Sequence, residues 1–229
     1  MFSLESIIIG CLFWPFWGAF ISGFGGYYLG SRLATYFSVF CLLISCFLSI
    51  YVLYYIGFYQ KSAIMLVVIT SVSSLVQIYA ISYMHSDPHK SRFFSCISLF
   101  TFFMLMLVTA ENYFQLFVGW EGVGLCSYLL ITFWYTRLQA NKGEIQAVMV
   151  NKVGRLILVI ALLLLFIIYH DTSFYNIFAN INYVSLSIPI KVMFAMSLYF
   201  FTKKYILAFV ETNFFIFMKI SNHILEILN

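Results

Sequence analysis

Long apolar segments without charge dominate this sequence and decide what it can fold into. One of them runs from Tyr113 to Tyr135 and contains a single charged residue, Glu121. A helix of that length rises about 1.5 Å per residue and crosses a hydrocarbon core of roughly 30 Å. Hydrophobic residues make up 63% of the chain and charged residues only 9%, whereas soluble domains are about half apolar and a quarter charged. The sequence therefore predicts a polytopic membrane protein.

The apolar segments are uninterrupted, which predicts helices, because the strands of a membrane barrel would show alternating hydrophobicity. A further apolar run from Ile188 leads into Lys203 and Lys204, and the tail beyond it has no assignment. The fold class is all-α, a transmembrane bundle of about six to eight helices forming a single membrane domain over residues 1–229. We expect the spans at residues 6–29, 35–58, 62–84, 93–110, 113–135 and 145–169.

Basic residues are unevenly divided among the connections. The connections that follow the first, third and fifth segments hold five of them, and the alternate connections hold only Lys61. The positive-inside rule therefore places the N-terminus on the outer side of the membrane and the His85–Arg92 loop on the inner side. The five basic residues are Arg32, Lys90, Arg92, Arg137 and Lys142.

Glu121 lies well inside the bilayer by residue count. A carboxylate there costs at least a few kcal/mol unless it is protonated, paired or hydrated, so we expect it to face protein. Gly119, Gly122 and Cys126 follow a helical i, i+3, i+7 spacing and form a stripe that a second helix can approach closely. Two interpretations of Glu121 stay open: a structural acid hydrogen-bonded to a neighbour, or a proton-relay group.

Glu121 needs a cationic partner, and the later segments offer candidates. Lys152 and Arg155 are three residues apart and share a face of the sixth segment, and Lys203 or Lys204 is the other option. A buried lysine can exchange its proton, whereas a guanidinium does not deprotonate. We therefore name Glu121, Lys203 and Lys152 as the candidate proton relay. For Lys152 and Arg155 the alternative is a static ion pair that orients two helices.

The cysteines and histidines do not form a metal-binding pattern. The five cysteines are scattered through apolar segments without a CxxC motif and are interpreted as buried thiols. His85 and His89 bracket Pro88, which interrupts a helix, so a polar loop is expected there. We expect neither a metal ion nor a cofactor in this chain.

Five blocks of sequence occur in order and close together: SSLVQIYAISYM, DPHKSRF, FTFFMLMLVTAEN, GWEGVGLCSYLLITFWYTRLQANK and VNKVG. With the earlier PFWGAFISGFGGYYLGSR, they resemble subunit 5 of mitochondrial NADH:ubiquinone oxidoreductase, respiratory complex I, a family of antiporter-like subunits. The resemblance covers residues 13–154. It implies that Glu121 is the acid of the family's lysine–glutamate pair.

The resemblance also implies a function and a location. The chain would be a core membrane-arm subunit of the enzyme that couples electron transfer from NADH to ubiquinone to proton translocation. It would lie in the mitochondrial inner membrane with its N-terminus on the intermembrane-space side. NADH, FMN, the Fe–S clusters and ubiquinone are expected in other subunits, so this chain performs no redox chemistry itself. The expected partners are the other membrane-arm subunits and lipids, and no nucleic acid is expected.

The sequence also departs from this family pattern. After Gly154 the family has an acidic residue and then Phe-Gly, whereas this chain has Arg155 and Leu156. Phe201–Lys204 resembles a remnant of the family's Gly-Lys-Ser-Ala-Gln helix, with Lys203 in the place of the lysine. The family's second helix bundle and lateral helix do not appear, so we expect a truncated or split first half completed by a separate chain. The alternatives are a non-pumping assembly scaffold of the same complex and a cation/proton antiporter subunit.

Overall fold

The computed structural model describes residues 4–56, 61–136 and 138–180. These residues form helices joined by short connections, and no strand occurs among them. Six of the helices are long and apolar enough to cross a membrane within this described part, which confirms the all-α polytopic fold class. The elements are α1 (Leu4–Phe24), α2 (Gly26–Leu29), α3 (Ser31–Ile56), α4 (Lys61–Tyr83), α5 (Lys90–Val108), α6 (Tyr113–Ile131), the 3-10 helix η1 (Thr132–Trp134), α7 (Leu138–Tyr169) and α8 (Phe174–Asn180).

The helix bounds follow the apolar segments to within about four residues, with two larger differences. The first segment is divided, because α1 ends at Phe24 and the short helix α2 precedes Gly30, whose φ of 81° suits glycine. The helix α7 begins at Leu138 rather than at Ile145, since its first residues are polar yet helix-forming. The predicted loop around Pro88 is confirmed, because α4 ends at Tyr83 and α5 begins at Lys90.

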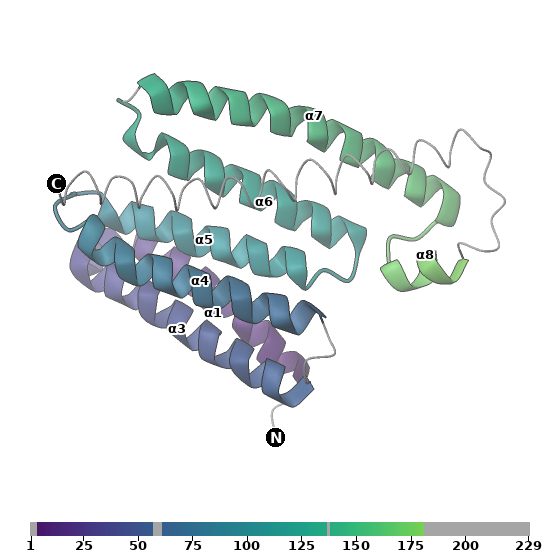
Figure 1. The fold of residues 1–229 in the computed structure, drawn as a ribbon, viewed down its shortest axis with the longest axis horizontal. Coiled ribbons are helices and arrows are strands. Elements are labelled where there is room, and N and C mark those ends of the chain that lie inside the picture. Colours follow the sequence, from purple (N-terminus) through teal and green to yellow (C-terminus); the bar gives the residue numbers. More distant parts are fainter. Residues whose placement is uncertain (1–3, 57–60, 137, 181–229) are drawn as a thin grey trace. The chain divides into compact units, whose positions relative to one another are not determined.

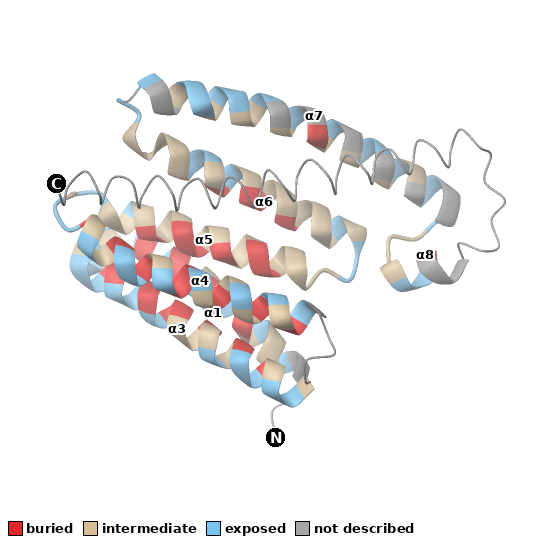
Figure 2. Ribbon diagram, viewed as in Figure 1, coloured by how far each residue is buried: buried red, intermediate tan, exposed pale blue. Residues whose placement is uncertain are grey.

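Residues Met1–Met149 and Val150–Asn229 form two compact units. In the first unit, α1 packs on α3 and α5, and α4 packs on the same two helices, so these four form a bundle (Figure 1). The helix α6 joins the bundle through α5. Buried residues gather where the four helices meet (Figure 2).

The interior of this bundle is rich in hydroxyl groups. The side chains of Ser49 and Thr70 are hydrogen-bonded at 2.8 Å and join α3 to α4. The Ser45 hydroxyl donates to the Cys11 carbonyl at 2.8 Å, and the Gln77 amide donates to the Ser98 hydroxyl at 2.8 Å. Small polar residues allow membrane helices to approach closely and link them by hydrogen bonds. These contacts hold α3, α4 and α5 together, and α6 packs on α5.

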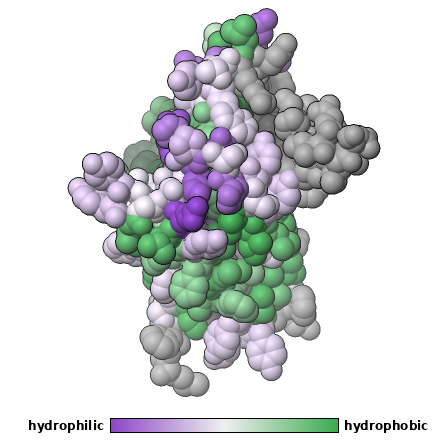
Figure 3. All heavy atoms as spheres, turned by 90° about the vertical axis from the view of Figure 1, so that its left-hand side faces the viewer, coloured by the Kyte–Doolittle hydropathy of each residue, from purple (hydrophilic) through white to green (hydrophobic). Residues whose placement is uncertain are grey.

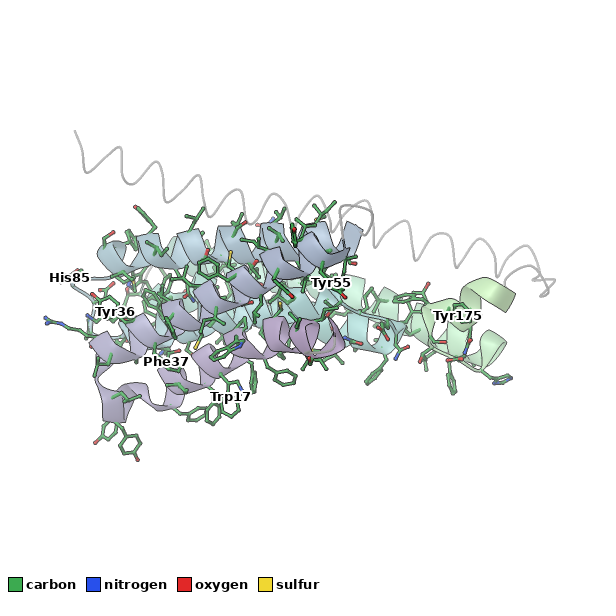
Figure 4. All side chains as sticks on the ribbon, turned by 90° about the horizontal axis from the view of Figure 1, so that it is seen from below. Trp17, Tyr36, Phe37, Tyr55, His85 and Tyr175 are labelled. Atoms are coloured by element: carbon green, nitrogen blue, oxygen red, sulfur yellow. The ribbon has the colours of Figure 1, made fainter. Side chains whose placement is uncertain are left out.

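Exposed tyrosines mark both ends of the first unit. Tyr54 and Tyr55 are exposed near the end of α3, and Tyr36 is exposed near its start. In Figure 4, Tyr36 and His85 lie at one end of the helices and Tyr55 lies toward the other. The 18 residues from Tyr36 to Tyr54 rise about 27 Å, close to the thickness of a hydrocarbon core. This spacing suits tyrosines at the two surfaces of a membrane, where aromatic residues are enriched.

The α4–α5 connection forms a polar end of the first unit. His85, Ser86, Pro88 and His89 are exposed in it. Figure 3 looks at this end of the helices and shows hydrophilic residues gathered there beside a hydrophobic flank. The polar connection thus closes one end of an otherwise apolar set of helices.

The second unit contains the later part of α7 and the short helix α8. The backbone N–H of His170 donates to the Phe166 carbonyl at 2.9 Å, and a φ of 52° at His170 turns the chain out of α7. Asp171 then holds the turn before α8, because its carboxylate accepts the backbone N–H groups of Thr172 and Ser173 at 2.6 and 3.0 Å and a hydrogen bond from the Asn176 side chain in the first turn of α8. The expectation of a single domain over residues 1–229 stays a prediction.

Candidate proton-transfer site

Glu121 occupies the middle of α6. It is half-buried and lies eight residues beyond Tyr113, the first residue of the helix. This separation corresponds to about 12 Å along the helix axis. Apolar residues dominate both halves of α6, so the carboxylate is held at a depth where an ionised group requires a partner or water.

The predicted small-residue stripe on α6 is confirmed, and the helix that approaches it is α5. Gly119 and Gly122 are buried. A Cβ atom at Gly119 would lie 3.0 Å from the backbone nitrogen of Leu107, and a Cβ atom at Gly122 would overlap the ring of Phe103. Both contacts are on α5, so glycine at these two positions permits the close packing of the two helices.

Glu121 lies on another face of α6. Each residue of an α-helix turns by about 100°, so Glu121 is roughly 130° around the axis from the centre of the stripe formed by Gly119, Gly122 and Cys126. Phe114 and Leu125 share the Glu121 face and are 65% and 56% exposed. The carboxylate is therefore on the side of α6 that faces away from α5.

Two small or polar positions follow Glu121 along the same face. Gly124 is one turn further on, and a Cβ atom there would meet no atom of the described residues within 4 Å. Tyr128 comes one turn later, and its hydroxyl group forms a hydrogen bond with the side chain of Glu144 on α7. Gly124 thus lies between Glu121 and Tyr128 on this face of the first unit, and Tyr128 is hydrogen-bonded to a second acid, Glu144.

The proposed cationic partners of Glu121 come from later segments of the sequence. Lys152 is exposed and Arg155 is half-buried on the part of α7 that belongs to the second unit. Lys203 and Lys204 lie outside the described residues. The pairing of Glu121 with Lys152 or Lys203 therefore stays a prediction. Among the described residues, no three His, Cys, Asp or Glu side chains cluster as metal ligands would.

This arrangement is that of a polytopic helical membrane protein with an acid inside its span. The family described as NADH-Ubiquinone oxidoreductase (complex I), chain 5 N-terminus, matches residues 56–94. The family described as NADH:quinone oxidoreductase/Mrp antiporter, TM, matches residues 110–216 and thus includes α6 and α7. The chain belongs to the complex I chain 5 family of antiporter-like membrane subunits.

Several curated relatives carry the name NADH-ubiquinone oxidoreductase chain 5. The protein of Phytophthora infestans is 41% identical over 204 residues, which cover 78% of this chain and 31% of that protein. The protein of Chondrus crispus is 45% identical over 194 residues, covering 73% and 29%. The protein of Marchantia polymorpha is 44% identical over 191 residues, covering 72% and 29%. The chain spans less than a third of the length of these relatives.

A solved structure shares the fold. It is that of the membrane-bound sulfane sulfur reductase (MBS), described as an archaeal respiratory membrane complex. The match has a TM-score of 0.62 at 15% sequence identity and covers 74% of this chain and 38% of that chain. At this level of identity the likeness concerns the path of the helices alone.

Sequence reasoning missed three residues of this site. Gly124, Tyr128 and Glu144 were not among the candidate residues, although the spacing of Glu121, Gly124 and Tyr128 is i, i+3, i+7 and predicts a common helix face. Glu144 could not be found in this way, because it comes from α7 and its contact with Tyr128 depends on how the chain turns after η1.

Proposed function

We propose that this chain is a membrane-arm subunit of NADH:ubiquinone oxidoreductase and takes part in the proton translocation of that enzyme. The observation that carries the proposal is the position of Glu121, a carboxylate in the middle of a membrane-spanning helix, on a face that α5 leaves accessible. Membership of the chain 5 family supports the assignment to this enzyme. The proposal extends to the mitochondrial inner membrane, because the curated relatives are eukaryotic chain 5 proteins.

Glu121 would work by exchanging one proton per cycle with its surroundings. When a lysine ammonium approaches the carboxylate, the ionised form is favoured and the proton leaves. When the ammonium withdraws, the charged form becomes costly in the apolar segment and the carboxylate takes up a proton. Lys152 and Lys203 are the proposed cations. A carboxylate and a lysine suffice for this step, so NADH, FMN, the Fe–S clusters and ubiquinone are assigned to other subunits.

The proposed orientation places the N-terminus on the intermembrane-space side. The α4–α5 connection, followed by Lys90 and Arg92 in the first turn of α5, then faces the matrix. Basic residues favour the inner side of a membrane because they are retained there during insertion. The proposed partners are other membrane-arm subunits, lipids, and a separate chain that carries the later helices of the family.

Two other functions predict different behaviour. A scaffold fragment of the same complex would support assembly without moving protons, and the replacement of the family's acidic residue by Arg155 favours it. A cation/proton antiporter subunit would share the matched membrane region, since that family description names Mrp antiporters as well.

Purification of the chain from its native membrane tests the assignment to the enzyme. A tag added to the N-terminus should isolate a complex that oxidises NADH and reduces ubiquinone. The same preparation, analysed by mass spectrometry, identifies the neighbouring chains and shows whether one of them carries the later helices. Isolation of the tagged chain without NADH dehydrogenase activity would contradict the assignment and favour the antiporter.

A further inference from the structure

We propose that Gly124, Tyr128 and Glu144 form a hydrated proton path that supplies Glu121 from the end of the helices where α6 connects to α7. The inference rests on the proposed proton role of Glu121 and adds the route by which the proton reaches it. It assigns a function to three residues that the lysine–glutamate pair does not use.

The positions on α6 form the first part of the argument. Glu121, Gly124 and Tyr128 follow one another by about one turn each, so the acid and the tyrosine are about 10 Å apart along the axis on one face. A hydroxyl and a carboxylate at that distance cannot exchange a proton directly, because proton transfer requires heavy atoms within about 3 Å or a bridging water.

The space at Gly124 supplies the missing link. Among the described residues, a Cβ atom at this position would meet no atom within 4 Å, whereas Gly119 and Gly122 on the same helix are closed by α5. Glycine at Gly124 is therefore not required for the packing of α6 on α5. Its effect is to leave room beside the backbone between Glu121 and Tyr128, where water can bridge the two groups.

Glu144 supplies the outer end of the path. It is half-buried near the start of α7 and shares a hydrogen bond with the Tyr128 hydroxyl group. Lys142 and Gln146, two residues to either side of it, are exposed, so polar side chains accompany Glu144 at this end of α7. Glu144 thus links the polar end of α7 to a hydroxyl group on the Glu121 face of α6.

The transfer balances without any other reactant than water. The protonated Glu144 carboxyl gives its proton to the Tyr128 oxygen as the Tyr128 O–H proton passes to the first of a chain of waters beside Gly124. Each water passes a proton to the next, and the last gives one to the Glu121 carboxylate. Glu144 is then reprotonated from bulk water, and Tyr128 and the bridging waters end the cycle unchanged.

The first test blocks the space. Gly124→Val fills it, and Gly143→Val is a matched control, because Gly143 is also a helical glycine whose Cβ atom would meet nothing within 4 Å. The number of protons moved per electron pair is measured in vesicles at equal content of the assembled complex. We expect Gly124→Val, Glu144→Gln and Tyr128→Phe to lower this ratio to the value of Glu121→Gln, and Gly143→Val to leave it at the wild-type value.

The second test asks whether water reaches the space, and it does not depend on turnover. In a background without native cysteines, Gly124→Cys should react with a charged, water-soluble thiol reagent added on the side of the α6–α7 connection. Leu129→Cys, at a position that is 42% exposed and about 140° around the helix from Gly124, should not react. Equal labelling at both positions, or at neither, would overturn the path.

The outcomes separate this inference from the proposed function. If Glu121→Gln lowers the ratio but the Gly124, Tyr128 and Glu144 variants do not, the path is wrong and the role of Glu121 stands. If Gly143→Val lowers the ratio as much as Gly124→Val, the effect does not come from filling this space and the path is also wrong. An unchanged ratio in Glu121→Gln would overturn the proposed function itself.

Discussion

The contact between Gly122 and Phe103 gives a sharp test of how α6 packs on α5. Alanine at Gly122 would drive its Cβ atom into the Phe103 ring, whereas alanine at Gly124 would meet no atom within 4 Å. Both substitutions gain the same helix propensity, about 0.5–1 kcal/mol. The difference between the two variants therefore isolates the overlap, for which overpacking in a close-packed interior costs about 1–3 kcal/mol.

The two variants are compared by heating detergent-solubilised membranes and measuring the fraction of the chain that remains in solution. We expect Gly122→Ala to aggregate at a lower temperature than Gly124→Ala. Phe103→Leu removes the ring, so the double variant should recover most of the lost stability, as expected for residues in direct contact. Equal melting of Gly122→Ala and Gly124→Ala, or no recovery in the double variant, would refute this packing of α6 on α5.

Three further predictions concern orientation, the turn before α8 and the bundle interior. Ser86 is exposed in the α4–α5 connection, and Asn112 is exposed just before α6. In a cysteine-free background, Ser86→Cys should react with an impermeant thiol reagent only from the matrix side, and Asn112→Cys only from the other side. The reverse pattern would invert the proposed topology. Hydrogen bonds from the Asn176 side chain and from the backbone of Ser173 and Thr172 lower the pKa of Asp171 from 3.8 to about 2, so Asp171 stabilises α8 above about pH 4 and loses this effect as the pH falls toward 2. Hydrogen exchange of the α8 amides, corrected for the intrinsic pH dependence, should therefore accelerate over that interval in the wild type but not in Asp171→Asn. Gln77 donates a hydrogen bond to Ser98, while its Oε1 atom is buried without a partner among the described residues. Gln77→Met should therefore change the melting temperature little, because Ser98 still donates to the Phe94 carbonyl. A large loss of stability would show that Oε1 has a partner.

The arrangement of the membrane spans could be predicted because length and apolarity alone determine them. Segments free of charge over about 20 residues must be helical in a bilayer, since every backbone group has to be satisfied internally. The start of α7 at Leu138 was not predicted, because its first turns are polar. Hydropathy indicates where a segment enters the membrane and not where its helix begins.

Only the part of the site that depends on residue spacing along one helix was predicted from the sequence. The spacing of Gly119, Gly122 and Cys126 indicated close approach of a second helix, and α5 makes that approach. The same spacing places Glu121 on another face of α6 than the one that contacts α5. Which cation meets Glu121 depends on tertiary packing between distant segments, and no periodicity within one helix encodes that.

The most direct test of the central claim is the number of protons moved per electron pair in Glu121→Gln. Glutamine keeps the size and hydrogen bonding of the side chain but cannot titrate, so the complex should assemble. Glu111→Gln is the matched control, because Glu111 is exposed in the α5–α6 connection and has no part in the proposed transfer. With both variants reconstituted in vesicles at equal content of the complex, the account predicts a lower ratio for Glu121→Gln and a wild-type ratio for Glu111→Gln. A wild-type ratio in Glu121→Gln would contradict the relay role and favour the scaffold.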